Sequence, residues 1–418
     1  MRILYEQDLA GSKYHGMAFR IYQFSKEFVD NGHEVMVVAA SYSHARKVNP
    51  NIKASITNEF IDGIHYKWIK TPRYSNNGIS RVFHMLVYNW RLWKNASKIA
   101  EEFNPDIVIS SGVTPLDFRA CHEIAKKAKA KIVYEVGDLW PLTPIELGGY
   151  SPKHPFIQIM QKAEDYVYKH TDIVISKLPC AEEYMNSRGL AKKKFYYLPN
   201  GIIESDWESP SPLPEIHLKI LNHLKNERKF LIGYAGSHSL ANSVSTLLDV
   251  ASGLINRPNL HFVLVGNGPL KSDLILKAKK RGLNNITFLD SISKTSIPSF
   301  LNLMDVLYIG FKKQSLYRFG ISPNKIFDYM MSAKPIIQAI EAGNNLVKDA
   351  QCGFSVEPES VNSITEAIIA LESITEEERQ IMGKNGKDYV LKYHSYSILT
   401  KRFLEILKKT INHGFELC

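Results

Sequence analysis

The residues that say most about chemistry lie in the stretch Arg318–Met330. Pro323 is expected at the first position of a helix, with Ser322 as its N-cap. Lys325 and Asp328 are three residues apart, so they share one face of the first turn. A cation beside unpaired helix N–H groups can hold a diphosphate, and a carboxylate one turn later can accept from two ribose hydroxyls. The alternative is a capped surface helix with an i, i+3 ion pair, but the preceding strand and basic loop favour a binding site.

Two glycine-containing loops follow predicted strands and offer further backbone N–H groups. Gly11–Gly16 lies between the first strand and the first helix, and Gly233–Ser237 ends the first strand of the second half. Glycine lets the backbone approach a phosphate or sugar closely, although an ordinary strand-to-helix turn is the competing interpretation. Gly266–Pro269 superficially resembles a dinucleotide fingerprint, but the third glycine position is Lys271, so we interpret this loop as a structural turn.

Asp138 and Trp140 follow another strand and suit a sugar ligand. The carboxylate can orient a hydroxyl and the indole can stack on a ring, while a helix-start carboxylate with a packing tryptophan is equally compatible. The sequence contains no D-x-D, H-E-x-x-H, P-loop or G-x-S-x-G motif, and its 14 histidines form no tight cluster. We therefore predict no metal and no cofactor, with a leaving diphosphate stabilised by Lys, Arg and backbone amides.

Short apolar runs alternate with amphipathic helical stretches, which is typical of parallel sheets in α/β proteins. The length of 418 residues and the turn-rich Leu198–Ile202 predict two doubly wound domains. The expected boundaries are 1–200, 201–394 and a C-terminal helical segment, 395–418, that returns to the first domain. The expected strands are Arg2–Tyr5, Glu34–Ala39, Ile107–Ser110, Lys131–Val136, Ile173–Ser176, Phe195–Leu198, Phe230–Ala235, His261–Val265, Ile286–Phe288, Val306–Ile309 and Pro335–Ile337.

Composition excludes some classes of protein. The net charge of +10 suits an anionic surface or a phosphorylated substrate, but no nucleic-acid recognition motif accompanies it, so no nucleic-acid partner is predicted. The four cysteines are far apart, which fits a reducing cytoplasm, and no apolar run is long enough to cross a bilayer. Arg81–Ala100 mixes aromatic and cationic residues. It predicts either peripheral docking on the inner face of the cytoplasmic membrane or an ordinary core helix.

These motifs, in this order, resemble family 4 of the retaining glycosyltransferases over essentially the whole chain. The resemblance rests on Gly11–Gly16, Gly32–Val35, Asp138–Pro141, Pro199–Ile202, Gly236, Gly266–Pro269 and Lys325–Pro335. More narrowly, Gly16–Arg20, Ser41–His44 and Ser322–Lys325 are similar to the L-fucosamine (N-acetylfucosamine) transferase branch, which builds O-antigen, capsule and related polysaccharides.

The resemblance implies the GT-B fold, two Rossmann-like domains with a nucleotide-sugar in the cleft between them. It implies transfer of an N-acetylated amino or deoxyamino hexose from a UDP-sugar, with retention, to a lipid-diphosphate-linked saccharide. Lys325 and Asp138 take the catalytic roles. The residues assigned to the donor are Gly16, Gly236, Asn242, Ser291, Ile292, Asn324, Lys325 and Asp328, and those assigned to the acceptor or sugar are His15, Arg20 and Trp140.

The chain departs from the family pattern at three places. Gly320 stands where many relatives have the first glutamate of a Glu-x7-Glu pair, and Gly137 stands where a His or Arg commonly precedes the aspartate. Ser237 and Asn242 replace an Arg and a Lys that often follow the second-domain glycine. Two other functions therefore remain open: a nucleotide-sugar 2-epimerase of the same fold, and a non-catalytic nucleotide-sugar-binding partner of another transferase.

Overall fold

The computed structural model describes residues 1–16, 20–75 and 78–412. The chain forms two compact units. The first consists of Met1–Pro199 and the chain after Ser395, and the second is Asn200–Ser395. The polypeptide therefore passes from one unit to the other twice, and the first unit is discontinuous in sequence.

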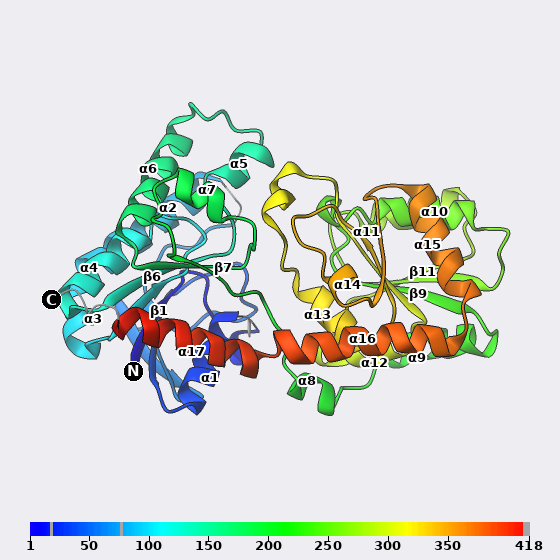
Figure 1. The fold of residues 1–418 in the computed structure, drawn as a ribbon, viewed down its shortest axis with the longest axis horizontal. Helices are drawn as coiled ribbons and strands as arrows, with labels where there is room; N and C mark the ends of the chain where they lie inside the picture. Colours follow the sequence, from blue (N-terminus) through cyan, green and yellow to red (C-terminus); the bar gives the residue numbers. More distant parts are fainter. Residues whose placement is uncertain (17–19, 76–77, 413–418) are drawn as a thin grey trace. The chain divides into compact units, whose positions relative to one another are not determined.

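The first unit is built on an eight-stranded sheet with the order β3-β4-β2-β1-β5-β6-β7-β8, in which only the β3–β4 pair is antiparallel. Helices cover both faces of this sheet (Figure 1). Its strands are β1 Arg2–Glu6, β2 Glu34–Ala40, β3 Ile56–Ile61, β4 Ile64–Ile69, β5 Ile107–Ser110, β6 Lys131–Val136, β7 Ile173–Ser176 and β8 Phe195–Tyr197. Its helices are η1 Lys13–His15, α1 Arg20–Asp30, α2 Ile79–Lys94, α3 Ala96–Phe103, α4 Phe118–Ala128, α5 Leu142–Glu146, α6 Pro155–His170, α7 Glu182–Ser187 and α17 Tyr396–Asn412.

The second unit is built on a six-stranded, all-parallel sheet with the order β11-β10-β9-β12-β13-β14. Its strands are β9 Phe230–Ala235, β10 Leu260–Val265, β11 Ile286–Leu289, β12 Val306–Gly310, β13 Ile336–Ala339 and β14 Gly353–Val356. Its helices are α8 Ser205–Glu208, α9 Glu215–Asn226, η2 Leu240–Asn242, α10 Ser245–Gly253, α11 Lys271–Lys280, η3 Lys294–Ser296, α12 Ile297–Asn302, η4 Ser315–Phe319, α13 Asn324–Met331, α14 Leu346–Asp349, α15 Val361–Ser373 and α16 Glu376–His394.

The central strands are apolar along their whole length because helices pack on both faces of each sheet. In β9, Leu231 and Ala235 belong to one hydrophobic cluster, while Ile232 and Tyr234 belong to the cluster on the opposite face. This alternation follows from the two-residue period of a strand. It leaves only the strand ends and their loops for polar chemistry.

Three strands were missed by the sequence prediction: β3, β4 and β14. β3 and β4 form a hairpin in which Ile61 pairs with Ile64, so the loop is only Asp62-Gly63. Both loop residues have positive φ, 51° and 81°, as a two-residue hairpin turn requires. The Asp62-Gly63 dipeptide is therefore a sequence feature from which this hairpin could have been predicted.

The C-terminal helix α17 lies beside α1 in the first unit (Figure 1). Phe403 of α17 makes edge-to-face contacts with Phe24 and Phe28 at centroid distances of 5.0 and 5.3 Å, and Tyr396 contacts Phe24 at 5.1 Å. Aromatic pairs of this geometry add to the free energy of burial. Apolar residues recur at helical spacing in Met17–Asn31 and predict a helix that Gly32 stops. Residues 17–19 lie outside the described residues, and α1 ends at Asp30, before Gly32.

Candidate functional site

In the second unit, the strand order reverses between β9 and β12, which is where open α/β sheets bind ligands. Lys325 of α13 reaches this edge. Its Nζ donates to Asn242 Oδ1 at 2.7 Å and to Tyr234 Oη at 3.4 Å. It also lies 5.0 Å from the ring centroid of Tyr234 and 5.7 Å from that of Phe311, which follows β12. All these partners are neutral, so the ammonium charge is not cancelled by a carboxylate.

Burial lowers the pKa of the Lys325 ammonium to about 8. Removing a cation from water without a counter-charge favours the neutral amine. An anion placed beside Nζ would restore the charged form. The environment of this lysine is therefore suited to a phosphate ligand.

Gly236 borders the same ammonium. A Cβ atom at this position would lie 3.0 Å from Lys325 Nζ and 3.0 Å from Tyr234 Oη. The glycine therefore keeps the space beside the charge open to a ligand. The structure thus brings together three residues assigned to the donor from sequence: Gly236, Asn242 and Lys325.

Asp328, one turn further along α13, is buried and has its own partner. Both of its carboxylate oxygens accept hydrogen bonds from Lys294 Nζ. Burial raises the pKa of the Asp328 carboxyl, and the Lys294 ammonium partly offsets the rise. Lys294 opens η3, just after Ser291 and Ile292, which the resemblance assigns to the donor, so the carboxylate and that loop are neighbours. Lys294 was not identified from sequence. The one local indication is Ser293, whose Oγ caps η3 and so marks the short helix that Lys294 begins.

The i, i+3 ion pair considered as the alternative does not form, because Lys325 and Asp328 each bind a different partner. The predicted helix start is wrong by one residue. α13 begins at Asn324, Pro323 is extended with ψ of 130°, and Ser322 Oγ accepts from Asn200 N at 2.9 Å instead of capping the helix. No side chain caps the first turn, and Asn324 is exposed there.

The Gly266–Pro269 loop packs against the loop after β9. A Cβ on Gly266 would lie 1.9 Å from Gly236 O, and His238 N donates to Asn267 O at 2.9 Å. Lys271 is buried and its Nζ donates to Gly266 O, Leu289 O and Asp290 Oδ1 at 3.0, 2.9 and 2.7 Å. This loop therefore supports the backbone around Gly236, in agreement with a structural turn.

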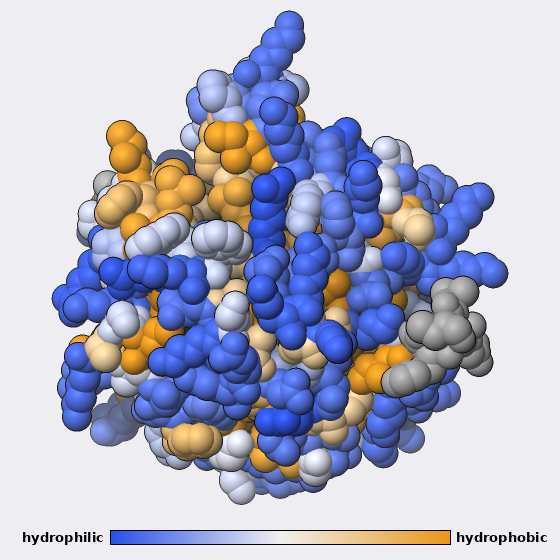
Figure 2. All heavy atoms as spheres, turned by 90° about the vertical axis from the view of Figure 1, so that its left-hand side faces the viewer, coloured by the Kyte–Doolittle hydropathy of each residue, from blue (hydrophilic) through white to orange (hydrophobic). Residues whose placement is uncertain are grey.

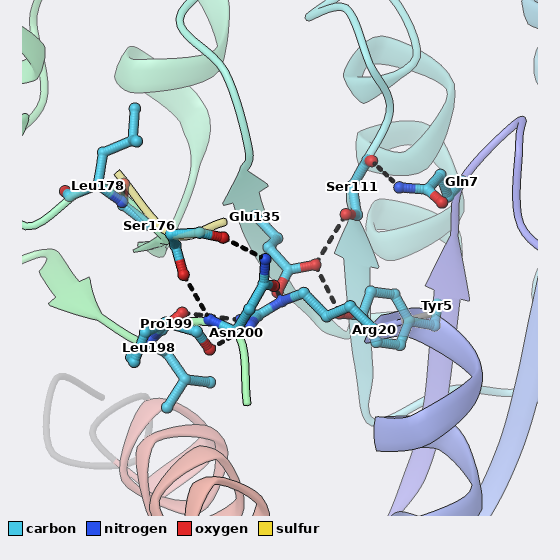
Figure 3. Close-up of polar contacts among 11 residues, drawn as sticks. Tyr5, Gln7, Arg20, Ser111, Glu135, Ser176, Leu178, Leu198, Pro199 and Asn200 are labelled. Atoms are coloured by element: carbon cyan, nitrogen blue, oxygen red, sulfur yellow. Dashed lines mark hydrogen bonds and ion pairs between the residues drawn. The ribbon is translucent and has the colours of Figure 1, made fainter. Parts of the chain in front are cut away.

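In the first unit, a buried ionic network lies at the carboxyl ends of β1, β5 and β6 (Figure 3). Glu135 accepts from Arg20 Nε, Tyr5 Oη and Ser111 Oγ at 2.7, 2.5 and 2.7 Å. The Arg20 guanidinium holds the pKa of the Glu135 carboxyl below its usual value even though burial acts in the opposite direction. A carboxylate that accepts three hydrogen bonds is well satisfied.

The Arg20 side chain, which was predicted to face the sugar, is bound inside the first unit. Its Nη1 donates to Pro199 O at 2.5 Å and its Nη2 to Leu198 O at 2.9 Å, in addition to the Glu135 contact. The side chain is 9 % exposed. Arg20 therefore ties α1 to the segment that directly follows β8, and its donors are committed within the protein.

His15 also points inward. Its Nδ1 lies 2.8 Å from Ser12 Oγ and its ring packs edge-on against Trp68 at 5.1 Å. Gly16, the next residue, is exposed and left-handed with φ of 68°, ending η1. Of the predicted motif Gly16–Arg20, residues 17–19 lie outside the described residues.

Asp138 and Trp140 follow β6. Asp138 is exposed, and Trp140 is half-buried with its ring edge-on to Phe156 at 6.4 Å. Gly137, between the strand and Asp138, is close to Lys177, which follows the neighbouring strand β7: a Cβ at 137 would lie 2.7 Å from Lys177 Nζ. Lys177 was not identified from sequence, since nothing local connects it to Asp138.

Helix α2 carries the aromatic and cationic segment. Its buried residues are His84, Tyr88 and Leu92, spaced four apart. The opposite face is apolar and exposed; the exposed fractions are 89 % for Ile79, 36 % for Val82, 58 % for Phe83, 55 % for Leu86, 55 % for Trp90 and 58 % for Trp93. Figure 2 shows groups of hydrophobic atoms on the surface of the first unit.

No helix in residues 1–16, 20–75 and 78–412 is long and apolar enough to cross a membrane. Within the same ranges, no three or more His, Cys, Asp or Glu side chains are arranged to hold a metal ion.

Comparison with known proteins agrees with the fold. Residues 14–205 match the model of glycosyltransferase family 4, and residues 218–389 match the model of glycosyl transferases group 1. These matches place the chain among the GT-B glycosyltransferases. Among solved structures, sucrose-phosphate synthase from Thermosynechococcus elongatus has a TM-score of 0.72 at 12 % identity, covering 99 % of this chain and 100 % of that one. The GT-B fold predicted from sequence is therefore confirmed.

Other relatives are similarly distant. HepE of Anabaena, solved with UDP and glucose, has a TM-score of 0.65 at 14 % identity over 98 % of this chain and 99 % of its own. A proposed teichuronic acid biosynthesis glycosyltransferase, TuaH of Bacillus subtilis (strain 168), is 19 % identical over 215 residues. That match spans 50 % of this GT-B chain and 50 % of TuaH.

Proposed function

We propose that this protein transfers a sugar from a UDP-sugar to an acceptor in polysaccharide biosynthesis. The observation that carries the proposal is the Lys325 ammonium, which has only neutral partners and lies beside the space kept open by Gly236. A cation held next to glycine amides suits a diphosphate leaving group. The UDP in the HepE structure and the name of TuaH support the donor nucleotide and the polysaccharide product.

In the proposed reaction, the bond between the anomeric carbon and the diphosphate oxygen breaks while the acceptor hydroxyl bonds to that carbon from the same face. The hydroxyl proton passes to the departing phosphate oxygen, and the configuration is retained. Lys325 stabilises the charge that develops on the diphosphate, and Asp328, with Lys294, binds the ribose. Asp138 contacts the transferred sugar. No metal is required in this scheme.

The donor sugar is proposed to be an N-acetylated amino or deoxyamino hexose, from the resemblance to the L-fucosamine transferase branch. Thermal unfolding with a panel of UDP- and GDP-sugars tests both the nucleotide and the sugar. A ligand present at 100 times its Kd stabilises the folded state by about 2.7 kcal/mol, so binding raises the Tm. UDP-N-acetylhexosamines are expected to raise the Tm most. The absence of a shift with every UDP and GDP compound would refute the proposal.

The acceptor is proposed to be a saccharide linked to a lipid diphosphate, reached by docking α2 on the anionic inner face of the cytoplasmic membrane. The exposed apolar residues of α2 recur at helical spacing and form one face. Cationic residues lie in the same region: Lys94 is exposed at the end of the helix, and Lys98 follows in α3. An apolar face with nearby cations is typical of helices that lie in the interface of an anionic bilayer. A core helix would instead bury this face.

Flotation with phosphatidylglycerol-containing vesicles at physiological salt tests the docking. The wild-type protein should float, and the double variant Phe83→Ser/Trp90→Ser should lose at least about 100-fold in vesicle affinity, because each buried large apolar side chain contributes about 1.5–3 kcal/mol. The matched control is Ile275→Ser/Leu276→Ser, which removes two exposed apolar residues from α11 of the second unit. Equal flotation of both double variants would contradict docking through α2.

A further inference from the structure

A lysine amine occupies the space where residue 137 would carry its side chain. β6 and β7 are parallel neighbours with Val136 opposite Ser176, so the residues that follow them, Gly137 and Lys177, are also adjacent. A Cβ atom built on Gly137 would lie 2.7 Å from Lys177 Nζ and 3.0 Å from Lys177 Cε. Glycine at 137 is therefore what allows the lysine to extend across the end of β6.

The Lys177 ammonium has no hydrogen-bond or ion-pair partner among the described residues. The nearby Glu135 carboxylate is already satisfied by Arg20, Tyr5 and Ser111 and needs no second cation. A half-buried cation without a partner costs free energy, which is typical of groups retained for a ligand.

Asp138 supplies the complementary group. It is exposed and directly follows Gly137, whose Cβ position lies 2.7 Å from Lys177 Nζ. Burial and the Arg20 charge lower the pKa of the Lys177 ammonium, while the negative charges of Glu135 and Asp138 act in the opposite direction. The two side chains do not form an ion pair with each other within the described residues. One edge of the sheet therefore presents a hydrogen-bond donor and an acceptor side by side.

We propose that Lys177 and Asp138 together bind the transferred sugar, with the Lys177 amine occupying the space that a side chain at position 137 would take. The inference rests on the proposed function. An ammonium only donates hydrogen bonds and a carboxylate only accepts them. Lys177 donates to a hydroxyl or acetamido oxygen of the sugar, and Asp138 accepts from a neighbouring hydroxyl. Gly137 is then not a lost catalytic position but the opening that admits Lys177.

The test separates sugar binding from nucleotide binding. The variant Lys177→Met removes the charge and keeps the length, Lys177→Arg restores a cation, and Gly137→Ala displaces the amine with one methyl group. Calorimetry gives the Kd for UDP and for the UDP-sugar selected by the thermal screen, and radiolabelled transfer to a membrane extract gives kcat/KM. The matched control is Lys162→Met, which removes an exposed lysine from α6 of the same unit.

Lys177→Met is expected to weaken UDP-sugar binding and to lower kcat/KM by about 10- to 100-fold, the scale of one lost charged hydrogen bond, while the Kd for UDP stays unchanged. Gly137→Ala should show a smaller loss of the same kind, and Lys177→Arg should recover part of it. Unchanged UDP-sugar affinity and transfer in Lys177→Met, with a wild-type Tm, would overturn the inference and leave the proposed function standing. Failure of the wild-type protein to bind UDP or UDP-sugar would instead refute the proposed function. If Lys177→Met does not fold, Gly137→Ala decides alone.

Discussion

Replacing Lys325 by alanine is the most direct test of how the diphosphate is stabilised. The ammonium has only neutral partners, Asn242 Oδ1 at 2.7 Å and Tyr234 Oη at 3.4 Å, so its charge is available to a ligand. A unit negative charge 4 Å from Nζ interacts by about 4 kcal/mol at the effective dielectric of about 20 that suits such sites. The interaction strengthens as charge develops on the leaving group, so most of it is expressed in the transition state.

We therefore expect Lys325→Ala to lower kcat/KM by about 100- to 1000-fold, which corresponds to about 2.7–4 kcal/mol. The assay is transfer of radiolabelled sugar from the UDP-sugar to a membrane extract that supplies acceptor. Lys280→Ala removes an equally positive but exposed residue from α11 and should retain wild-type activity. A Lys325→Ala enzyme that is within a few-fold of wild type would remove Lys325 from the mechanism.

Two further predictions concern charge. Because burial lowers the pKa of Lys325 to about 8, and a bound diphosphate raises it again, UDP-sugar affinity should be constant near neutral pH and fall by up to about tenfold per pH unit above 8. Calorimetry from pH 6.5 to 9.5 measures this, and a Lys325→Met protein with the same alkaline loss would contradict it. Glu135→Gln should destabilise the protein by about 3–5 kcal/mol, since Arg20 is left buried without its counter-charge. Urea unfolding measures the loss; an unchanged midpoint would show that the pair contributes nothing.

The local pattern of apolar residues was sufficient to predict the central strands of both sheets. The central strands are continuous apolar runs, and runs such as Ile107–Ser110 and Phe230–Ala235 have the predicted bounds. Edge strands carry a weaker signal. In β3 the middle residues Thr57, Asn58 and Glu59 are polar, because this strand lies at the edge of the sheet and needs no apolar residue on each face.

The candidate site was predictable where neighbours in sequence are also neighbours in space. The Gly-rich loop after β9 and the Lys325 turn of α13 could be recognised from their types and their position after strands. The contacts of Lys325 and Asp328 could not, because Asn242 and Lys294 come from other loops. Arg20 illustrates the same limit: only the fold brings Glu135 to its guanidinium, which changes a candidate sugar contact into an internal bond.

Because the chain passes from the first unit to the second and back again, the two units are completed in a fixed order during translation. Asn200–Ser395 is one uninterrupted segment that can fold as soon as it leaves the ribosome, whereas the first unit waits for α17, which is translated after that segment, to cover Phe24 and Phe28. The part of the molecule that is translated first is thus the last to be finished. A premature stop near residue 395 would leave the segment that holds Lys325 intact but expose the aromatic residues of α1 that α17 covers. The truncated chain would then be prone to aggregate through this exposed apolar patch.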